Sequence, residues 1–389
     1  MQGIKRITAI AGIATVLAYP ASAQGLSDID QSIRERLYDP AMIDSNQPVG
    51  PSVYADFVAK NPPPWTIGYA SSYAGNTWRA ATIEQLRDEI IPKWKSLGLL
   101  EELIITQSNL DDEVQATQMR ELVDQGVDAI IVCCSNPVAL NETVKYAYDQ
   151  GVPTFSFTGY LESEYAINSS VNYHLAGFQI GRLMAEEIGG EGNVLVVEGI
   201  PGTSASDSQD QGVKAGLRTA DGITVVNTLP GMWTGQIAQG EVHKWLRSYS
   251  GQLDGVVVQS SGEMGVLRAL AQSDLAHIPV AIGGELGALC YWRRNPDFIS
   301  GAIQTWPPQD DIALIWDIMM RTLQGQGPKI QSVLVDPVEI TFEDLKNIMG
   351  TDCDPHSSKW LSVGKDRWGS PGFLDSFFYR PSDPTRFQR

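Results

Sequence analysis

The sequence has 389 residues, of which 43% are hydrophobic and 19% charged, so it has the length of two ordinary domains and the composition of a folded globular protein. This composition excludes disorder as the main state. The chain carries 28 Lys and Arg against 46 Asp and Glu, a formal net charge of -18. A field of that sign repels the phosphates of nucleic acids and of anionic lipids, so we expect no nucleic-acid partner.

The N-terminus has the pattern of a secretory signal peptide. Lys5 and Arg6 precede an apolar run over residues 7–19, and small residues follow at Ala21 and Ala23. The run is shorter than the roughly 20 residues that a membrane-spanning helix needs, and the residue directly after Ala23 is not a Cys. We therefore expect residues 1–23 to be removed on export to the periplasm, without a lipid anchor.

The four cysteines are compatible with an exported protein, which can keep disulfides. Cys133 and Cys134 end an apolar run, where we expect a structural role. Cys290 and Cys353 are placed so that a bridge between them would tie the C-terminal tail to the body, but pairing cannot be read from sequence and stays open. The histidines are scattered and no CxxC occurs, so we expect no metal site.

Strands and helices alternate regularly through the first half of the chain. Residues 24–64 form a polar extension that ends in the stiff stretch 61–64 (Asn-Pro-Pro-Pro). The apolar periodicity then predicts strands over residues 65–70, 103–106, 128–132 and 152–157, and helices over residues 76–91, 111–126 and from 136 onward. Repeated strand and helix units of this kind indicate a parallel sheet with helices on both faces.

The same alternation continues in the second half. Predicted strands cover residues 166–171, 193–198, 223–228, 255–259, 280–282, 299–304 and 332–340, and predicted helices include residues 176–188 and 309–323. Two doubly wound α/β domains are implied, with a ligand cleft between the carboxyl ends of their strands. Residues 346–389 have little periodicity and are expected to form an ordered or semi-ordered tail.

Sequence motifs of catalysis and nucleotide binding are missing. The sequence contains no GxxxxGK[ST] phosphate loop, no GxGxxG after a strand and no GxSxG nucleophile elbow. We therefore expect no cofactor and no enzymatic activity, although a catalytic triad can also be assembled from distant residues.

Polar and aromatic residues gather where the predicted strands end. Aromatic faces can bury the apolar C–H faces of a sugar or polyol, while amides and carboxylates bond to its hydroxyl groups. This combination favours a hydroxyl-rich ligand. The segments that carry it are residues 71–79, 158–160, 199–207, 232–233, 259–262, 283–285 and 304–306.

Between Trp65 and Ile340 the chain resembles the type I periplasmic sugar-binding proteins of ATP-driven (ABC) importers, the ribose- and galactose-binding-like family. The resemblance is carried by several short segments together, each of them weak alone. They are residues 69–79, 125–132 (Gln-Gly-Val-Asp-Ala-Ile-Ile-Val), 149–153, 177–182, 197–203 and 212–216.

The resemblance implies two lobes that close on a ligand and are joined by three crossovers, near residues 159–165, 282–286 and 304–309. The N-terminal lobe would then comprise residues 65–160 and 284–306. The C-terminal lobe would comprise residues 161–283 and 307–345, with residues 346–389 as a tail.

The resemblance also implies which positions contact ligand. Thr158 stands where many family members have an Asp followed by an Arg, and the Arg expected at the start of the helix near Asp207 is absent. These departures favour a polyol, a small sugar or a modified sugar over an ordinary aldopyranose, while acidic groups beside Trp rings would also suit a cationic ligand. The predicted ligand-binding residues are Ser72, Asn76, Trp78, Thr158, Asp207, Trp233, Ser261, Glu285, Thr305 and Trp306.

The expected function is therefore that of a monomeric periplasmic receptor that passes a sugar or polyol to the membrane permease of an ABC importer. Two alternatives remain open at this stage. A receptor that presents its ligand to a sensor kinase or chemoreceptor would share the fold, and an exported carbohydrate-acting enzyme would share the α/β class.

Overall fold

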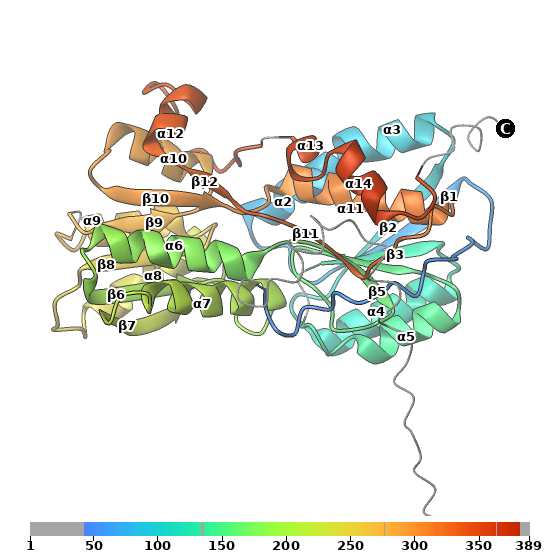
Figure 1. Cartoon of the computed structure of the whole chain (residues 1–389), viewed down its shortest axis with the longest axis horizontal. Helices are drawn as coiled ribbons and strands as arrows, with labels where there is room; N and C mark the ends of the chain where they lie inside the picture. The colour runs from blue at the N-terminus through green and yellow to red at the C-terminus, as the bar shows by residue number, and fades with distance from the viewer. Residues whose placement is uncertain (1–42, 134–135, 276, 363, 382–389) are drawn as a thin grey trace, which may run out of the picture.

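The computed structural model describes residues 43–133, 136–275, 277–362 and 364–381, which form two lobes side by side (Figure 1). Each lobe contains one six-stranded sheet with helices on both faces, so the predicted α/β class with two doubly wound lobes is confirmed. The predicted signal peptide and its cleavage site lie outside the described residues, as does Cys134. None of the described helices is both long and apolar enough to cross a membrane.

The first lobe contains a sheet with the strand order β11-β5-β4-β3-β1-β2, in which all neighbours are parallel. Its central strands β3, β4 and β5 are buried throughout because both of their faces are covered. The strands are β1 (Trp65–Ser71), β2 (Leu100–Gln107), β3 (Ala129–Cys133), β4 (Thr154–Phe157), β5 (Ala166–Val171) and β11 (Ser332–Val335).

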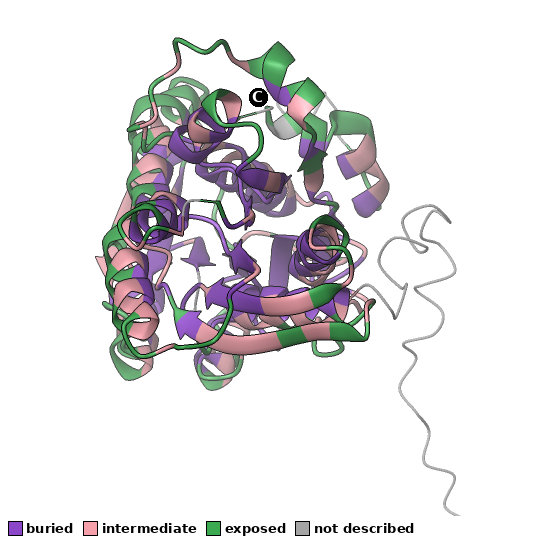
Figure 2. Cartoon of the chain, turned by 90° about the vertical axis from the view of Figure 1, so that its left-hand side faces the viewer, coloured by how far each residue is buried: buried purple, intermediate pink, exposed green. Residues whose placement is uncertain are grey.

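The second lobe contains a sheet with the order β12-β10-β9-β8-β6-β7, parallel except for the edge strand β12, which runs antiparallel to β10. The inner strands β8 and β9 are buried, whereas the edge strand β7 is mostly half-buried or exposed, and Figure 2 shows the outer faces of the helices and loops exposed. The strands are β6 (Glu191–Glu198), β7 (Gly222–Pro230), β8 (Gly255–Val258), β9 (Val280–Ile282), β10 (Ile299–Gln304) and β12 (Val338–Ile340).

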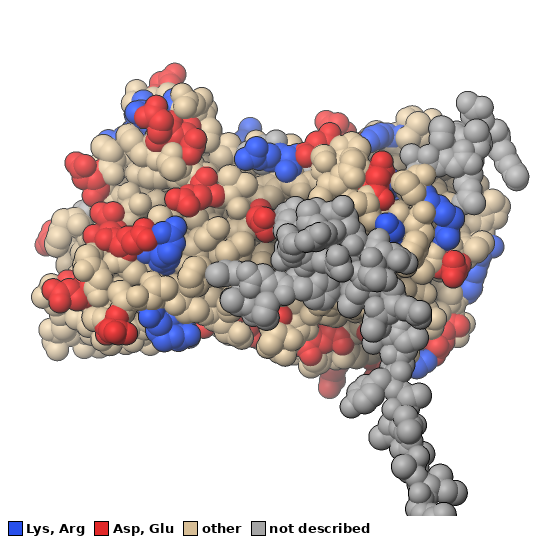
Figure 3. Space-filling model, viewed as in Figure 1, with Lys and Arg blue, Asp and Glu red and all other residues tan. Residues whose placement is uncertain are grey.

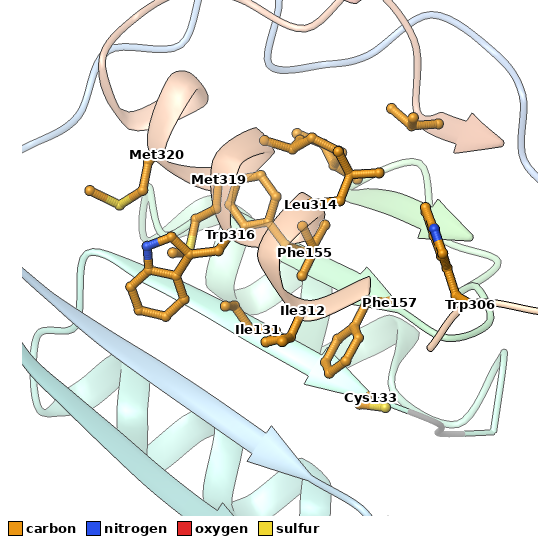
Figure 4. Packing of buried hydrophobic residues seen from close by; sticks show 14 of the residues in the cluster. Ile131, Cys133, Phe155, Phe157, Trp306, Ile312, Leu314, Trp316, Met319 and Met320 are labelled. Carbon is orange, nitrogen blue, oxygen red and sulfur yellow. The ribbon is translucent and has the colours of Figure 1, made fainter. Parts of the chain in front are cut away.

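The main core of the first lobe lies between its sheet and helix α11. Ile312 and Trp316 of that helix are fully buried against the sheet, where Ile131 and Phe155 project from β3 and β4 (Figure 4). Helices α4 and α5 enclose a separate core on the other face. The helices of this lobe are α2 (Thr77–Gln85), the π-helical turn η2 (Leu86–Ile90), α3 (Ile91–Ser96), α4 (Asp112–Asp124), α5 (Asn141–Asp149), α11 (Pro308–Leu323), α13 (Lys365–Trp368) and α14 (Pro371–Phe377).

In the second lobe, α6 and α7 approach each other closely because glycines face across their contact. A Cβ at Gly212 would lie 2.9 Å from the backbone nitrogen of Phe178 and closer still to the carbonyl oxygen of His174. The helices are α6 (Tyr173–Glu187), α7 (Ser204–Leu217), α8 (Gly235–Leu246), α9 (Glu263–Ala271), α10 (Leu286–Arg294) and α12 (Phe342–Ile348).

Three segments connect the lobes. The chain passes from β5 to α6 at Asn172, from β10 to α11 through residues 305–307, and from β11 to β12 through residues 336–337. The expected crossing near 304–309 agrees with the second of these, whereas the crossings expected near 159–165 and 282–286 do not occur there.

The strand pairing explains both differences. The loop after β4 returns to the same sheet, because β5 pairs with β4, and β9 is followed by α10 and β10 within the second lobe. Thus β5, α11 and β11 belong to the first lobe, although residues 161–283 and 307–345 were expected in the second. Conversely, β10 belongs to the second lobe, although residues 284–306 were expected in the first. Strands buried on both faces look alike in sequence, so their local pattern does not assign them to a sheet.

The tail expected from residue 346 is ordered where it is described. It begins on the second lobe, where Cys353 forms a disulfide with Cys290 of α10. It then crosses to the first lobe and packs Leu374 and Phe377 into the core beside α11. The possible bridge between the tail and the body is therefore present in the structure.

Candidate ligand-binding site

A small cavity, partly open to solvent, lies between the lobes at the carboxyl ends of their strands. Its walls come from the segments after β1 and β4 in the first lobe, from those after β6, β7 and β8 in the second, and from the beginning of α6 and the crossing after β10. The lining residues are Tyr73, Asn76, Trp78, Arg79, Thr158, Tyr173, Ile200, Gln209, Trp233, Ser260, Ser261 and Thr305.

The first wall is built by the beginning of α2. Asn76 caps this helix, since its side-chain oxygen accepts a hydrogen bond from the backbone nitrogen of Arg79 at 2.8 Å. Trp78, the second residue of this helix, lies against the cavity, where its Nε1 donates to the carbonyl oxygen of Trp306 at 3.2 Å. Capping therefore brings an amide and an indole ring to the same wall.

Arg79 is the only charged side chain among the lining residues and is 3% exposed. Its Nε donates to the carbonyl oxygen of Tyr73 at 3.0 Å, and its terminal nitrogens donate to the hydroxyl of Tyr69 and to Sγ of Cys133. The guanidinium also lies 5.0 Å from the ring centre of Trp78. This network fixes the loop after β1.

Three lining residues have a left-handed backbone conformation, which is unfavourable for residues other than glycine. The φ angles are +54° at Thr158, directly after β4, and +48° at Trp233 and +71° at Ser261, each three residues after a strand. Such left-handed residues cost roughly 1–3 kcal/mol each and tend to cluster at functional sites. Thr158 is β-branched, and its hydroxyl donates to a carboxylate oxygen of the fully buried Asp311 on α11.

The second lobe supplies the opposite wall. Gly199 leaves room for the indole of Trp233, because a Cβ there would lie 2.6 Å from Cζ2 of that ring. The side-chain oxygen of Gln259 accepts a hydrogen bond from the backbone nitrogen of Gly199 at 2.9 Å. The phenol of Tyr73 lies 3.4 Å from the hydroxyl of Thr234, so the two walls meet beside Trp233.

Six of the ten predicted ligand-binding residues line this cavity: Asn76, Trp78, Thr158, Trp233, Ser261 and Thr305. Four lie elsewhere. The hydroxyl of Ser72 donates to the carbonyl oxygen of Cys133 at 2.8 Å, and the carboxylate of Asp207 accepts from the Gly202 nitrogen at 3.0 Å. The ring of Trp306 is 1% exposed and packs in the core of the first lobe (Figure 4).

Glu285 is the fourth predicted residue outside the cavity lining. It is 8% exposed at the beginning of α10, where the backbone bridges to Trp360 of the tail. Burial raises the pKa of Glu285 to about 7, while a hydrogen bond with Glu263 and attraction to Arg268 partly oppose that shift. The pKa of Glu263 is raised well above its usual value by its own complete burial and by the nearby charge of Glu285.

This carboxyl pair lies behind the cavity wall. A Cβ at Gly283 would lie 2.9 Å from Oε1 of Glu263 and closer still to Oγ of Ser260, which lines the cavity. Because burial favours the protonated forms of the pair, its negative charge is reduced near neutral pH. The described residues contain no group of three or more His, Cys, Asp or Glu side chains that could hold a metal ion.

Six lining residues were not among the predicted ones: Tyr73, Arg79, Tyr173, Ile200, Gln209 and Ser260. Most lie in or just beyond the strand-end segments that the sequence singles out, but composition does not tell which side chain faces inward. Tyr173 had no such signal, because the crossing that places it at the cavity was expected elsewhere.

A sequence model of the family described as "Periplasmic binding protein domain" matches residues 67–327. The xylitol-binding protein of Mycolicibacterium smegmatis is 30% identical over 242 residues, which cover 61% of this chain and 68% of that protein.

Solved structures share the fold. An ABC transporter solute-binding protein from Thermobispora bispora superposes with a TM-score of 0.69 at 23% identity, covering 77% of this chain and 92% of that one. A solute-binding protein from Bacillus halodurans with bound myo-inositol gives a TM-score of 0.65 at 17% identity, covering 74% and 98%.

These matches confirm the resemblance that the short segments between Trp65 and Ile340 indicated. The prediction that the chain is no enzyme agrees with them, because the proteins it matches are binding proteins. The overall fold is the feature that the solved structures share with this chain. This chain is a member of the periplasmic binding protein family.

Proposed function

We propose that this protein captures a neutral sugar or polyol in the periplasm and delivers it to the permease of an ABC importer. The observation that carries the proposal is the chemistry of the cavity lining, which combines two indole rings with hydroxyl and amide groups and contains no carboxylate. Indole faces cover C–H groups, while the hydroxyls and amides bond to ligand hydroxyls. The cationic ligand left open by the sequence is disfavoured, because Arg79 is the only charged lining residue.

The relatives support the same ligand class. One curated relative is named for xylitol and one structural neighbour holds myo-inositol, both neutral polyols. Both walls of the cavity come from one chain, which supports a receptor that works as a monomer. On the face shown in Figure 3, acidic side chains are spread over both lobes without a broad basic patch, which supports the absence of a nucleic-acid partner.

Binding would stabilise the closed arrangement of the lobes. A ligand shifts an equilibrium between open and closed forms only through contacts that it makes in one form and not in the other. Lining residues from both lobes, such as Asn76 and Gln209, supply such contacts only when the lobes are close. Closure then presents the surfaces of both lobes to a membrane partner in one fixed arrangement.

The test is a thermal-shift screen of the purified protein against xylitol, myo-inositol, arabinose, xylose, ribose and galactose, followed by calorimetry on the best hit. A ligand that binds only the folded protein raises its stability in proportion to the logarithm of the ligand concentration. We expect a neutral polyol or sugar to bind, and Trp78→Ala to weaken that binding at least tenfold. No shift with any of these compounds, or an unchanged affinity in Trp78→Ala, would contradict the proposal.

Transport is tested separately in the source cell. Deletion of the gene should abolish uptake of the radiolabelled hit, and the intact gene should restore it. If uptake survives while transcription or swimming responses to the hit are lost, the protein serves a sensor kinase or chemoreceptor instead.

A further inference from the structure

The crossing at residues 305–307 is both a hinge segment and a wall of the cavity. Thr305 lines the cavity, and the carbonyl oxygen of Trp306 accepts the indole N–H of Trp78 at 3.2 Å. Any movement of this crossing therefore moves the ring of Trp78 or breaks its hydrogen bond. Residues that hold the crossing in place therefore also shape the cavity.

On the first-lobe side, the crossing is held by the tail. The rings of Trp306 and Trp368 meet edge to face, with centres 6.2 Å apart and planes inclined by 67°. Trp368 donates its indole N–H to one carboxylate oxygen of Asp310 at 3.2 Å, and the hydroxyl of Ser362 donates to the other at 2.9 Å. Asp310 lies in the first turn of α11, directly after the crossing.

On the second-lobe side, the preceding residues of the same tail hold the other end of the crossing. Gln304, the last residue of β10, donates from its side chain to the carbonyl oxygen of Leu361. The backbone nitrogen of Leu361 in turn donates to the carbonyl oxygen of Gly284 at 3.1 Å, and that of Leu286 donates to Lys359 at 2.9 Å. Residues 359–362 and 364–368 therefore contact the chain on both sides of the crossing.

Both ends of the tail are anchored. The disulfide between Cys353 and Cys290 fixes its beginning to α10 of the second lobe. Its later part is fixed to the first lobe by Phe377, which is 2% exposed in the core and accepts a backbone hydrogen bond from Lys329 at 2.7 Å. A covalent link keeps the stretch between the anchors from detaching, because it limits the conformations available to the released chain.

We propose that the C-terminal tail is a brace for the crossing at residues 305–307, in which Trp368 positions Trp306 and, through it, the Trp78 wall of the cavity. The brace acts on the equilibrium between lobe arrangements, since its contacts are made on both sides of one hinge segment. Its effect on ligand affinity rests on the proposed function, whereas its effect on the hinge does not.

The first experiment measures amide hydrogen exchange in the absence of ligand, in oxidised protein, in protein reduced with a phosphine, and in Cys353→Ser. Peptides covering residues 299–310 should exchange roughly tenfold faster when the disulfide is absent. Peptides covering β8, in the core of the second lobe, serve as the internal control and should be unchanged. Unchanged exchange at 299–310 in fully reduced protein, verified by mass, would overturn the proposal.

The second experiment replaces Trp368, the residue proposed to position Trp306. Trp368→Ala should speed exchange at residues 299–310 as reduction does, whereas Trp368→Phe, which keeps an aromatic edge against Trp306, should restore most of the protection. Tyr249→Ala, which removes a ring stacked on Trp245 in the second lobe, is the matched control and should leave the crossing unaffected. Unchanged exchange in Trp368→Ala, or an equal effect of Tyr249→Ala, would overturn the proposal.

Calorimetry with xylitol separates the two proposals. If wild-type protein binds xylitol, Trp368→Ala should bind it at least fivefold more weakly and Trp368→Phe nearly as well as wild type. An unchanged affinity in Trp368→Ala would overturn the positioning role. If wild-type protein binds none of the screened compounds, the proposed function fails, while the exchange measurements still decide whether the tail braces the crossing.

Discussion

The indole of Trp233 occupies the space that a side chain at position 199 would need. A Cβ on Gly199 would lie 2.6 Å from Cζ2 of that ring and closer still to Nε1. Trp233 has a φ angle of +48°, so its backbone is already in an unfavourable conformation and has little freedom to adjust. The absence of a side chain at position 199 is therefore a requirement of the cavity wall.

Gly199→Ala should weaken ligand binding by displacing the Trp233 ring. We expect at least a tenfold loss of affinity, about 1.4 kcal/mol, measured by calorimetry with the best hit of the ligand screen. Gly240→Ala is the matched control, because nothing lies within 4 Å of a Cβ at that exposed helical position. Equal affinities of the two variants would show that Trp233 does not contact the ligand.

Gly212→Ala should destabilise the second lobe. The added methyl group would collide with the backbone of α6 at His174 and Phe178, and neither backbone can move without separating the two helices. Overpacking of this kind costs about 1–3 kcal/mol, which denaturant unfolding can measure. The same Gly240→Ala control should be neutral or slightly stabilising, and a wild-type stability for Gly212→Ala would mean that α6 and α7 are farther apart than described.

Ser204→Ala should favour separation of the lobes. The Ser204 hydroxyl, at the beginning of α7 in the second lobe, donates to the carbonyl oxygen of Tyr160 at 3.0 Å and accepts from its nitrogen at 2.8 Å, which joins it to the loop after β4. Losing both bonds removes about 1–2 kcal/mol from the closed form. Small-angle scattering without ligand should show a larger radius of gyration for the variant. An identical scattering profile would show that this contact does not hold the lobes together.

The stability of the protein should fall as the pH rises from about 4.5 to about 7, partly because of Glu285. Its ordinary pKa is 4.5 and burial raises it to about 7 in the folded protein, so between these values the unfolded chain releases a proton that the folded protein retains. The free energy of unfolding therefore decreases across this window, by up to about 3 kcal/mol from this group, and no further above it.

Glu285→Gln isolates that contribution. Denaturant unfolding at intervals between pH 4.5 and pH 8 should show a shallower decline for the variant than for wild type, because the amide does not titrate. The two proteins should differ most above pH 7, where wild type bears the full cost of the buried charge. Parallel curves would contradict the assignment of this pH dependence to Glu285.

The order of elements could be predicted from sequence because it depends on local periodicity. The apolar stretches that form β1, β3 and β6 alternate with helical stretches, and Gly126 and Gly189 mark the ends of α4 and α6. Sheet membership could not be predicted in the same way. The pairing of β10 with β9 and of β11 with β5 depends on contacts between distant segments, so the crossings were expected at the wrong places.

The cavity residues, too, could be predicted only where local sequence determines them. Strand-end segments could be identified, and with them Asn76, Trp78 and Trp233, because parallel strands place their carboxyl ends at one edge. The direction in which each side chain points could not be predicted from the sequence. Glu285 resembled a ligand-binding carboxylate, but the tail covers it and Glu263 lies beside it, and both facts depend on long-range packing.

The central claim is that a neutral sugar or polyol is held between the lobes by the indoles of Trp78 and Trp233. The most direct test is a crystal structure of the protein with the best hit of the ligand screen. The account predicts the ligand between these two rings, with its hydroxyl groups within hydrogen-bonding distance of Asn76 and Gln209. A ligand bound outside this cavity, or one that contacts a single lobe, would contradict it.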